Sequence, residues 1–147
     1  MDFRRKKMGN MWLTGDIYKK GLIPEGIICL DTASGIHDLT TCMPSPVMLY
    51  SPYETELCGS YICMIPHEID YADTELITGK LYVTNKERTI CELIAERHSD
   101  SLIYEALENY LAVHPVEGLY KVSDKYVERD QLDYYINTLQ DYRNEDW

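Results

Sequence analysis

Residues 83–95, V-T-N-K-E-R-T-I-C-E-L-I-A, most constrain the fold because a strand pattern changes to a helix pattern within them. The strand-like run 80–83 ends at Thr84, and a helix is expected to start there. Thr84 and Glu87 have the spacing of a capping box, in which each side chain takes one unpaired N–H group of the first turn. The apolar side chains then recur at helical spacing, at Ile90, Leu93 and Ile94. We therefore predict a sheet-to-helix junction here.

Glu87, Arg88 and Thr89 are the candidate site residues at this junction. A cation in the first turn opposes the helix dipole, which favours anions at that end. We therefore expect Arg88 to have a specific partner. Two interpretations remain open. In the main one, Glu87 and Arg88 fix the sheet to the helix through a cap and an ion pair; in the other, they contact a binding partner directly.

Short strand-like segments come first along the chain and helical stripes follow. The strand candidates are residues 47–50, 61–65, 75–78 and 80–83, with the less certain segment 67–71, and residues 27–30 are too few to classify by periodicity. The helix candidates are residues 33–39 (capped by Asp31 or Thr32), 86–97, 102–111 and a last helix from 123, with 116–122 as a loop or a short extended piece. This order predicts the α+β class: a short mixed or antiparallel sheet of about four to five strands, followed by a C-terminal cluster of about three helices.

The chain divides by composition into three parts. Residues 1–22 form a basic arm, 23–140 a single α+β domain, and 141–147 an acidic tail that we expect to fray. Residues 1–20 hold six Lys/Arg and two Asp, a net charge of +4, and the rest holds eight Lys/Arg and 23 Asp/Glu, a net charge of −15. A domain with this much negative charge is a poor candidate for general binding to the nucleic-acid backbone, and it suits a basic protein partner. The alternative interpretation is that the negative charge only keeps the protein surface hydrated.

Four basic residues near the start of the chain are the candidates for any nucleic-acid contact. They are Arg4, Arg5, Lys6 and Lys7. A phosphate-contacting arm and a frayed terminus are the two interpretations of this run.

The thirteen tyrosines, against a single phenylalanine, are unusual. A tyrosine buries its ring and keeps its hydroxyl in water, so many amphipathic positions at the margin of a core would explain the excess. Tyrosine is also favoured at protein interfaces, so a recognition surface is the alternative.

The five cysteines form no C-x-x-C pair. Cys29, Cys63 and Cys91 lie in apolar runs and are expected to be small core residues. The sequence has no pattern of a signal peptide and no apolar run long enough to span a membrane. These observations predict a cytoplasmic protein that does not enter a membrane.

The sequence lacks the common catalytic and nucleotide-binding motifs. It has no G-x-G-x-x-G, no P-loop, no H-E-x-x-H and no G-x-S-x-G. His67, Glu68 and Asp70 resemble a metal cluster, but neighbouring strand residues face opposite sides, so His67 and Glu68 would not converge. We expect a protein that is not an enzyme, with no cofactor and no metal.

Four segments resemble one known family. They are I-P-E-G-I-I-C-L-D-T-A-S-G-I-H-D-L (23–39), V-M-L-Y (47–50), N-K-E-R-T-I-C-E-L-I (85–94) and A-L-E-N-Y-L (106–111). Their order and spacing over about residues 23–140 are similar to the C-terminal domain of AbiEi-type antitoxins. The third segment is very similar to the E-R-T-I core of that family, and it is the most specific of the four.

The resemblance implies an antitoxin or transcriptional regulator of the abortive-infection, type IV toxin–antitoxin class. Members of the family carry an N-terminal winged helix that binds promoter DNA, and their partner is a nucleotidyltransferase-like toxin. Residues 1–22 are too short for a winged helix, so DNA binding is doubtful and the toxin-neutralising part remains. The expected function is neutralisation of such a toxin by protein–protein contact, through an exposed tyrosine-rich or acidic patch. The alternative is an acidic inhibitor of a nucleic-acid enzyme, which would mimic a polyanion.

Overall fold

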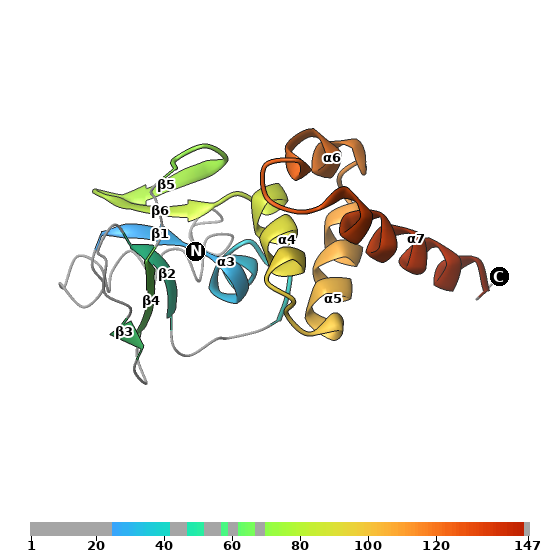
Figure 1. Cartoon of the computed structure of the whole chain (residues 1–147), viewed down its shortest axis with the longest axis horizontal. Helices are drawn as coiled ribbons and strands as arrows, with labels where there is room; N and C mark the ends of the chain where they lie inside the picture. Colours follow the sequence, from blue (N-terminus) through green and yellow to red (C-terminus); the bar gives the residue numbers. More distant parts are fainter. Residues whose placement is uncertain (1–24, 42–46, 52–56, 59–61, 67–69, 146–147) are drawn as a thin grey trace, which may run out of the picture.

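The computed structural model describes residues 25–41, 47–51, 57–58, 62–66 and 70–145, and Figure 1 shows the arrangement of their elements. The described strands are β1 (Gly26–Ile28), β2 (Val47–Ser51), β3 (Leu57–Cys58), β4 (Ile62–Pro66), β5 (Thr74–Thr78) and β6 (Leu81–Thr84). The described helices are α3 (Leu30–Ile36), α4 (Lys86–Ala95), α5 (Asp100–Leu111), α6 (Glu117–Ser123) and α7 (Arg129–Glu145). The sheet lies on one side of Figure 1 and α4 to α7 on the other, which confirms the α+β prediction.

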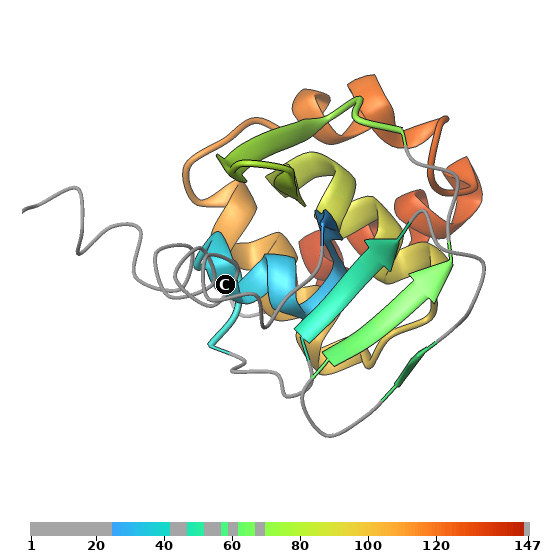
Figure 2. The same cartoon turned by 90° about the vertical axis from the view of Figure 1, so that its left-hand side faces the viewer.

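The six described strands form one mixed sheet in the order β3-β4-β2-β1-β6-β5. The short strand β1 lies at its centre, antiparallel to β2 and parallel to β6. The predicted hairpin of β5 and β6 is antiparallel, whereas β2 and β4 run parallel, side by side in Figure 2. The less certain strand candidate, residues 67–71, gives no described strand. Asp70 and Tyr71 lie outside the strands, and residues 67–69 lie outside the described part of the chain.

Gly26 lets β1 approach β2 closely. Its φ of +152° lies in a region that side chains rarely adopt. A Cβ atom at this position would also lie closer than 3.0 Å to the carbonyl oxygen of Tyr50 on β2. The start of the central strand therefore depends on glycine.

Side chains of β1 alternate between two cores, as the period of a strand requires. Ile28 packs with Ala33 and Ile36 of α3 in the smaller cluster. Ile27 belongs to the larger cluster, which the helices α4 to α7 complete. The sheet is thus packed on both faces, and the helical side holds the larger core.

Helix α4 is the central element of the helical side. Seven consecutive residues of it, from Arg88 to Ile94, are buried. It contacts α3, α5, α6 and α7, which lie around it. A helix that is enclosed on all sides buries its polar residues too, and this places Arg88 inside the protein.

Several element boundaries differ from the prediction. Helix α3 begins at Leu30, with Cys29 at its N-cap and no side-chain cap, instead of behind Asp31 or Thr32. The segment predicted as a loop, 116–122, forms most of α6 (Glu117–Ser123). The last helix begins at Arg129 instead of residue 123.

The acidic tail also differs from the prediction, because residues 141–145 continue α7. The helix is long enough to carry them: it extends 17 residues from Arg129 to Glu145. Residues 146–147 and the basic arm, 1–22, lie outside the described part of the chain.

The prediction for Cys63 was wrong, since this residue is disulfide-bonded instead of a free core thiol. Cys29 and Cys91 are buried free cysteines, as small core residues should be. Burial raises the pKa of the Cys91 thiol to about 12, with nearby Glu92 adding to the effect, so this thiol stays protonated and unreactive. Among the helices that the structure describes, none has the length and apolarity that crossing a bilayer requires.

Candidate functional site

The junction between sheet and helix is capped by Asn85 and not by the predicted pair of Thr84 and Glu87. The Asn85 side chain accepts a hydrogen bond of 2.9 Å from the backbone N–H of Arg88. Thr84 is still part of strand β6, where it pairs with Thr74 of β5. The helix therefore starts one residue later than the capping box requires, which leaves Glu87 out of register with the cap.

Thr89 fastens the end of β6 to the first turn of α4. Its hydroxyl lies 2.6 Å from the hydroxyl of Thr84 and 2.6 Å from the carbonyl oxygen of Asn85. Both threonines are fully buried. These contacts join the last strand residue to the helix within the core.

Arg88 is the largest fully buried side chain, at 1% exposure. Its Nη1 donates hydrogen bonds to the carbonyl oxygens of Asp70 (2.8 Å) and Ala72 (2.9 Å). Its Nε lies 3.4 Å from the Glu92 carboxylate, one turn further along α4. The specific partners expected for Arg88 are thus main-chain oxygens of the segment before β5 and a carboxylate of its own helix.

Two tyrosine rings enclose the Arg88 guanidinium, which lies 4.9 Å from the ring centroid of Tyr126 and 5.8 Å from that of Tyr50. The Tyr126 hydroxyl donates to Asp73 at 2.6 Å. Burial and this bond to Asp73 raise the pKa of Tyr126 above its usual range. Burial, Cys29 and Glu92 do the same to the pKa of Tyr50. The guanidinium is therefore the positive centre of a buried polar network in which the two tyrosine hydroxyls stay protonated.

Glu87 lies apart from this network. It is half-buried, and its carboxylate adds to the effect of burial in raising the pKa of the Tyr110 hydroxyl on α5. The structure thus brings Arg88 and Thr89 into the interior and directs Glu87 toward α5. The other candidates, Arg4, Arg5, Lys6 and Lys7, lie outside the described residues, and so do His67 and Glu68.

Within the described part of the chain, no group of three or more His, Cys, Asp or Glu side chains could hold a metal ion. Asp70, the third member of the suggested metal cluster, is exposed. It accepts a hydrogen bond from the backbone N–H of Ala72, which makes it part of a turn.

A group of tyrosines lies over α5 and α7 on the described surface, and we call it the tyrosine surface. Its members are Tyr104, Tyr134, Tyr135 and Tyr142. The ring centroids of Tyr104 and Tyr135 are 5.3 Å apart, and those of Tyr134 and Tyr135 are 5.4 Å apart in an edge-to-face pair. Tyr134 and Tyr142 are each 62% exposed. Large aromatic groups so exposed are costly to hydrate and are suited to contact with another molecule.

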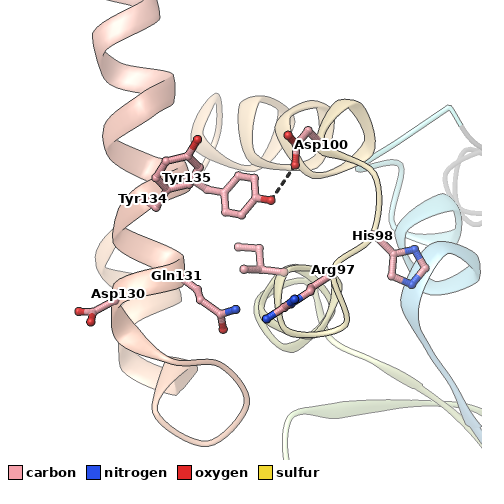
Figure 3. Close-up of a pocket in the computed structure, with 8 residues that line it drawn as sticks. Arg97, His98, Asp100, Asp130, Gln131, Tyr134 and Tyr135 are labelled. Carbon is pink, nitrogen blue, oxygen red and sulfur yellow. Dashed lines mark hydrogen bonds between the residues drawn. The ribbon is translucent and has the colours of Figure 1, made fainter.

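One hollow of about 430 Å³ lies where α7 passes the end of α4 and the start of α5, and we call it the first hollow. Its lining residues are Ile94, Arg97, His98, Asp100, Asp130, Gln131, Tyr134 and Tyr135. Figure 3 shows the side chains of Arg97 and Gln131 reaching toward one another across it, while Asp130 points away. The Tyr135 hydroxyl donates to Asp100 at 2.7 Å, and this bond and burial raise the pKa of Tyr135 to about 12.

The second hollow, of about 340 Å³, lies further along α5 and α7. Tyr104 and Glu108 line it from α5, and Thr138, Leu139 and Tyr142 line it from α7. Leu139 is buried, whereas Glu108 is exposed. The lining combines aromatic rings, an aliphatic side chain and one carboxylate.

The two helices under the tyrosine surface are acidic. Together they hold seven Asp/Glu and two Arg, a net charge of −5. The acidic and aromatic residues therefore belong to the same two helices. The sequence analysis expected a tyrosine-rich or acidic patch but did not locate it, although Tyr104 with Glu108 and Thr138 with Tyr142 are i,i+4 pairs that share a side of their helices.

Arg97 carries backbone strain at the rim of the first hollow. It follows α4 with a φ of +57°, and the N–H groups of Arg97 and His98 bond back to Ile94 and Leu93. This is the closing pattern of a helix for which glycine is the preferred residue. Asp38 closes α3 in the same way, with the same φ of +57°.

We expect Arg97→Gly to raise the free energy of unfolding by about 1 kcal/mol, because glycine adopts positive φ without strain. Urea unfolding monitored by circular dichroism measures the change. Asp38→Gly is the matched control and should gain less, since aspartate tolerates this conformation better. A loss of stability in Arg97→Gly would mean that the arginine side chain holds the hollow together.

No family model matches this chain, and neither a curated protein nor a solved structure matches it.

Proposed function

We propose that this chain is a non-enzymatic, antitoxin-like or regulator-like protein that neutralises a nucleotidyltransferase-like toxin by protein–protein contact. The proposal combines the resemblance of residues 23–140 to AbiEi-type antitoxins with the surface chemistry of the described residues. The observation that carries it is the tyrosine surface, where Tyr134 and Tyr142 are largely exposed on helices of net charge −5. Exposed tyrosines beside hollows, as Tyr134 is at the first and Tyr142 at the second, are typical anchors of protein interfaces.

The E-R-T-I segment, residues 87–90, has a structural role in this proposal. Arg88 and Thr89 are buried and bonded within the chain, so they fix α4 against the sheet. Helices α5 and α7 pack on α4 and present the tyrosine surface from that fixed base. In this arrangement the family-like segment positions the contact surface instead of forming it.

The proposal places the protein in the cytoplasm. A reducing cytoplasm would open the disulfide of Cys63, so the cytoplasmic protein carries a thiol at this position. The tyrosine surface lies on the helical side, away from β4, where Cys63 is located. The contact surface is thus independent of the redox state of that residue.

Co-expression with a nucleotidyltransferase-like toxin, sought in the gene next to the one for this chain, tests the proposal. The wild-type chain should restore growth of cells that express the toxin. The double variant Tyr134→Ala/Tyr142→Ala should lose most of this rescue, because a tyrosine at the centre of an interface can contribute about 2 kcal/mol to binding, which is about thirtyfold in affinity for each residue. Colony counts at matched expression levels measure the effect.

Tyr71→Ala is the matched control, because Tyr71 is an exposed tyrosine (53%) outside the tyrosine surface. It should rescue growth as the wild type does. Failure of the wild-type chain to rescue growth, or full rescue by the double variant, would overturn the proposal.

The acidic-inhibitor alternative predicts binding dominated by charge. Purified complex formation measured at low and high salt separates the two ideas. A contact through tyrosines keeps most of its affinity in high salt, whereas a polyanion mimic loses it because salt screens its charges.

A further inference from the structure

The second hollow is lined by side chains of the kinds that bind organic cations. Tyr104 and Tyr142 supply aromatic rings and Glu108 supplies a carboxylate. Of the described residues that line it, none is Lys or Arg. The face of an aromatic ring attracts cations, and a carboxylate beside it adds charge complementarity.

Among the described residues, two other places show this combination, and an arginine completes each of them. Arg88 lies over Tyr126 and Tyr50 beside the Glu92 carboxylate. Arg129 lies 4.9 Å from the ring centroid of Tyr120, whose hydroxyl bonds to Asp133.

The second hollow also has a defined geometry. The ring of Tyr104 packs against that of Tyr135, with ring centroids 5.3 Å apart, and this contact supports its position beside the hollow. The buried Leu139 lies between the α7 residues Thr138 and Tyr142 along the chain and gives the hollow an aliphatic wall. Such a wall fits the methylene stem of a long side chain, with its charged head at Glu108.

We infer that the second hollow binds an arginine side chain from a basic segment of the partner. The guanidinium lies against the ring of Tyr142 and pairs with the carboxylate of Glu108. Arginine fits better than lysine because its planar head stacks on tyrosine rings and is more weakly hydrated. This inference rests on the proposed function, since it names the chemistry of the partner at the same surface.

A chemical-shift titration of the ¹⁵N-labelled full chain with the peptide acetyl-Gly-Arg-Gly-amide tests the inference. Amide signals of residues 104–108 and 138–142 should move and saturate. The peptide with citrulline, which has nearly the shape of arginine without its charge, should bind at least about fivefold more weakly. The lysine peptide should fall between the two.

Glu108→Gln should weaken binding of the arginine peptide about fivefold, the upper range for one exposed charge pair. Glu117→Gln is the matched control, because Glu117 is an exposed glutamate on α6 that does not line the hollow. It should leave binding unchanged. Equal binding of the citrulline peptide, tighter binding of the lysine peptide, an unaffected Glu108→Gln variant or shifts confined to other residues would each overturn the inference.

The titration contains no toxin, so the two proposals fail separately. Absence of arginine binding together with growth rescue removes the arginine site and leaves the antitoxin function. Arginine binding without rescue leaves the site and removes that function.

Discussion

Replacing Arg88 with alanine is expected to lower the free energy of unfolding by about 3–5 kcal/mol, the usual effect of removing one member of a buried ion pair. The Glu92 carboxylate, which is 7% exposed, would lose the cation that pairs with it in the interior. The carbonyl oxygens of Asp70 and Ala72 would also lose their donor. Urea unfolding monitored by circular dichroism measures the loss.

Arg129→Ala is the control for Arg88→Ala, since Arg129 also lies over a tyrosine ring but is exposed. It should cost less than about 1 kcal/mol. The double variant Arg88→Met/Glu92→Leu should recover part of the stability, because an apolar pair leaves no buried charge. A single Arg88→Ala variant within 1 kcal/mol of the wild type would contradict the role assigned to the network.

The second large effect is expected at the start of the central strand. Gly26→Ala should lower the free energy of unfolding by about 3 kcal/mol, because it adds a strained positive φ and a close contact with the Tyr50 carbonyl. The close contact is with main chain, so no side-chain rotation can relieve it. The midpoint of thermal unfolding measures the change.

Gly79→Ala separates the two causes, since Gly79 also has a positive φ (+56°) but lies exposed in the turn before β6. It should cost about 1 kcal/mol, the strain alone. Equal losses in the two variants would show that the approach of β1 to β2 contributes nothing.

The order of strands and helices was predictable because it depends on local periodicity. The stripe of Leu102, Ile103, Ala106, Leu107 and Tyr110 predicts α5 in the correct place. Helix α6 was not predictable in this way. Its short sequence contains Gly118, which lies against the Tyr110 hydroxyl, and its Leu119 is buried in the core. The local sequence of α6 favours a helix only weakly, so tertiary packing stabilises it.

The candidate site was predictable only in part. The position of Arg88 in the first turn of α4 required a specific partner, but main-chain oxygens 16 and 18 residues upstream leave no mark in the sequence. The capping prediction failed because Thr84 still pairs with Thr74 in the sheet, and this pairing depends on the register of β5 and β6. The location of the tyrosine surface was not predictable, because α5 and α7 form it jointly and the sequence of neither helix shows how the two pack together.

The short strand β1 also governs when this protein can fold during synthesis. Gly26 of β1 pairs with Leu81 of β6, 55 positions later (81 − 26), and Ile27 pairs with Tyr50 of β2. Such distant pairing closes slowly, because the loop entropy is lost before the contacts form. Until β6 leaves the ribosome, one edge of β1 stays unpaired. A nascent chain stalled before residue 84 therefore exposes an apolar strand edge that invites pairing with another chain.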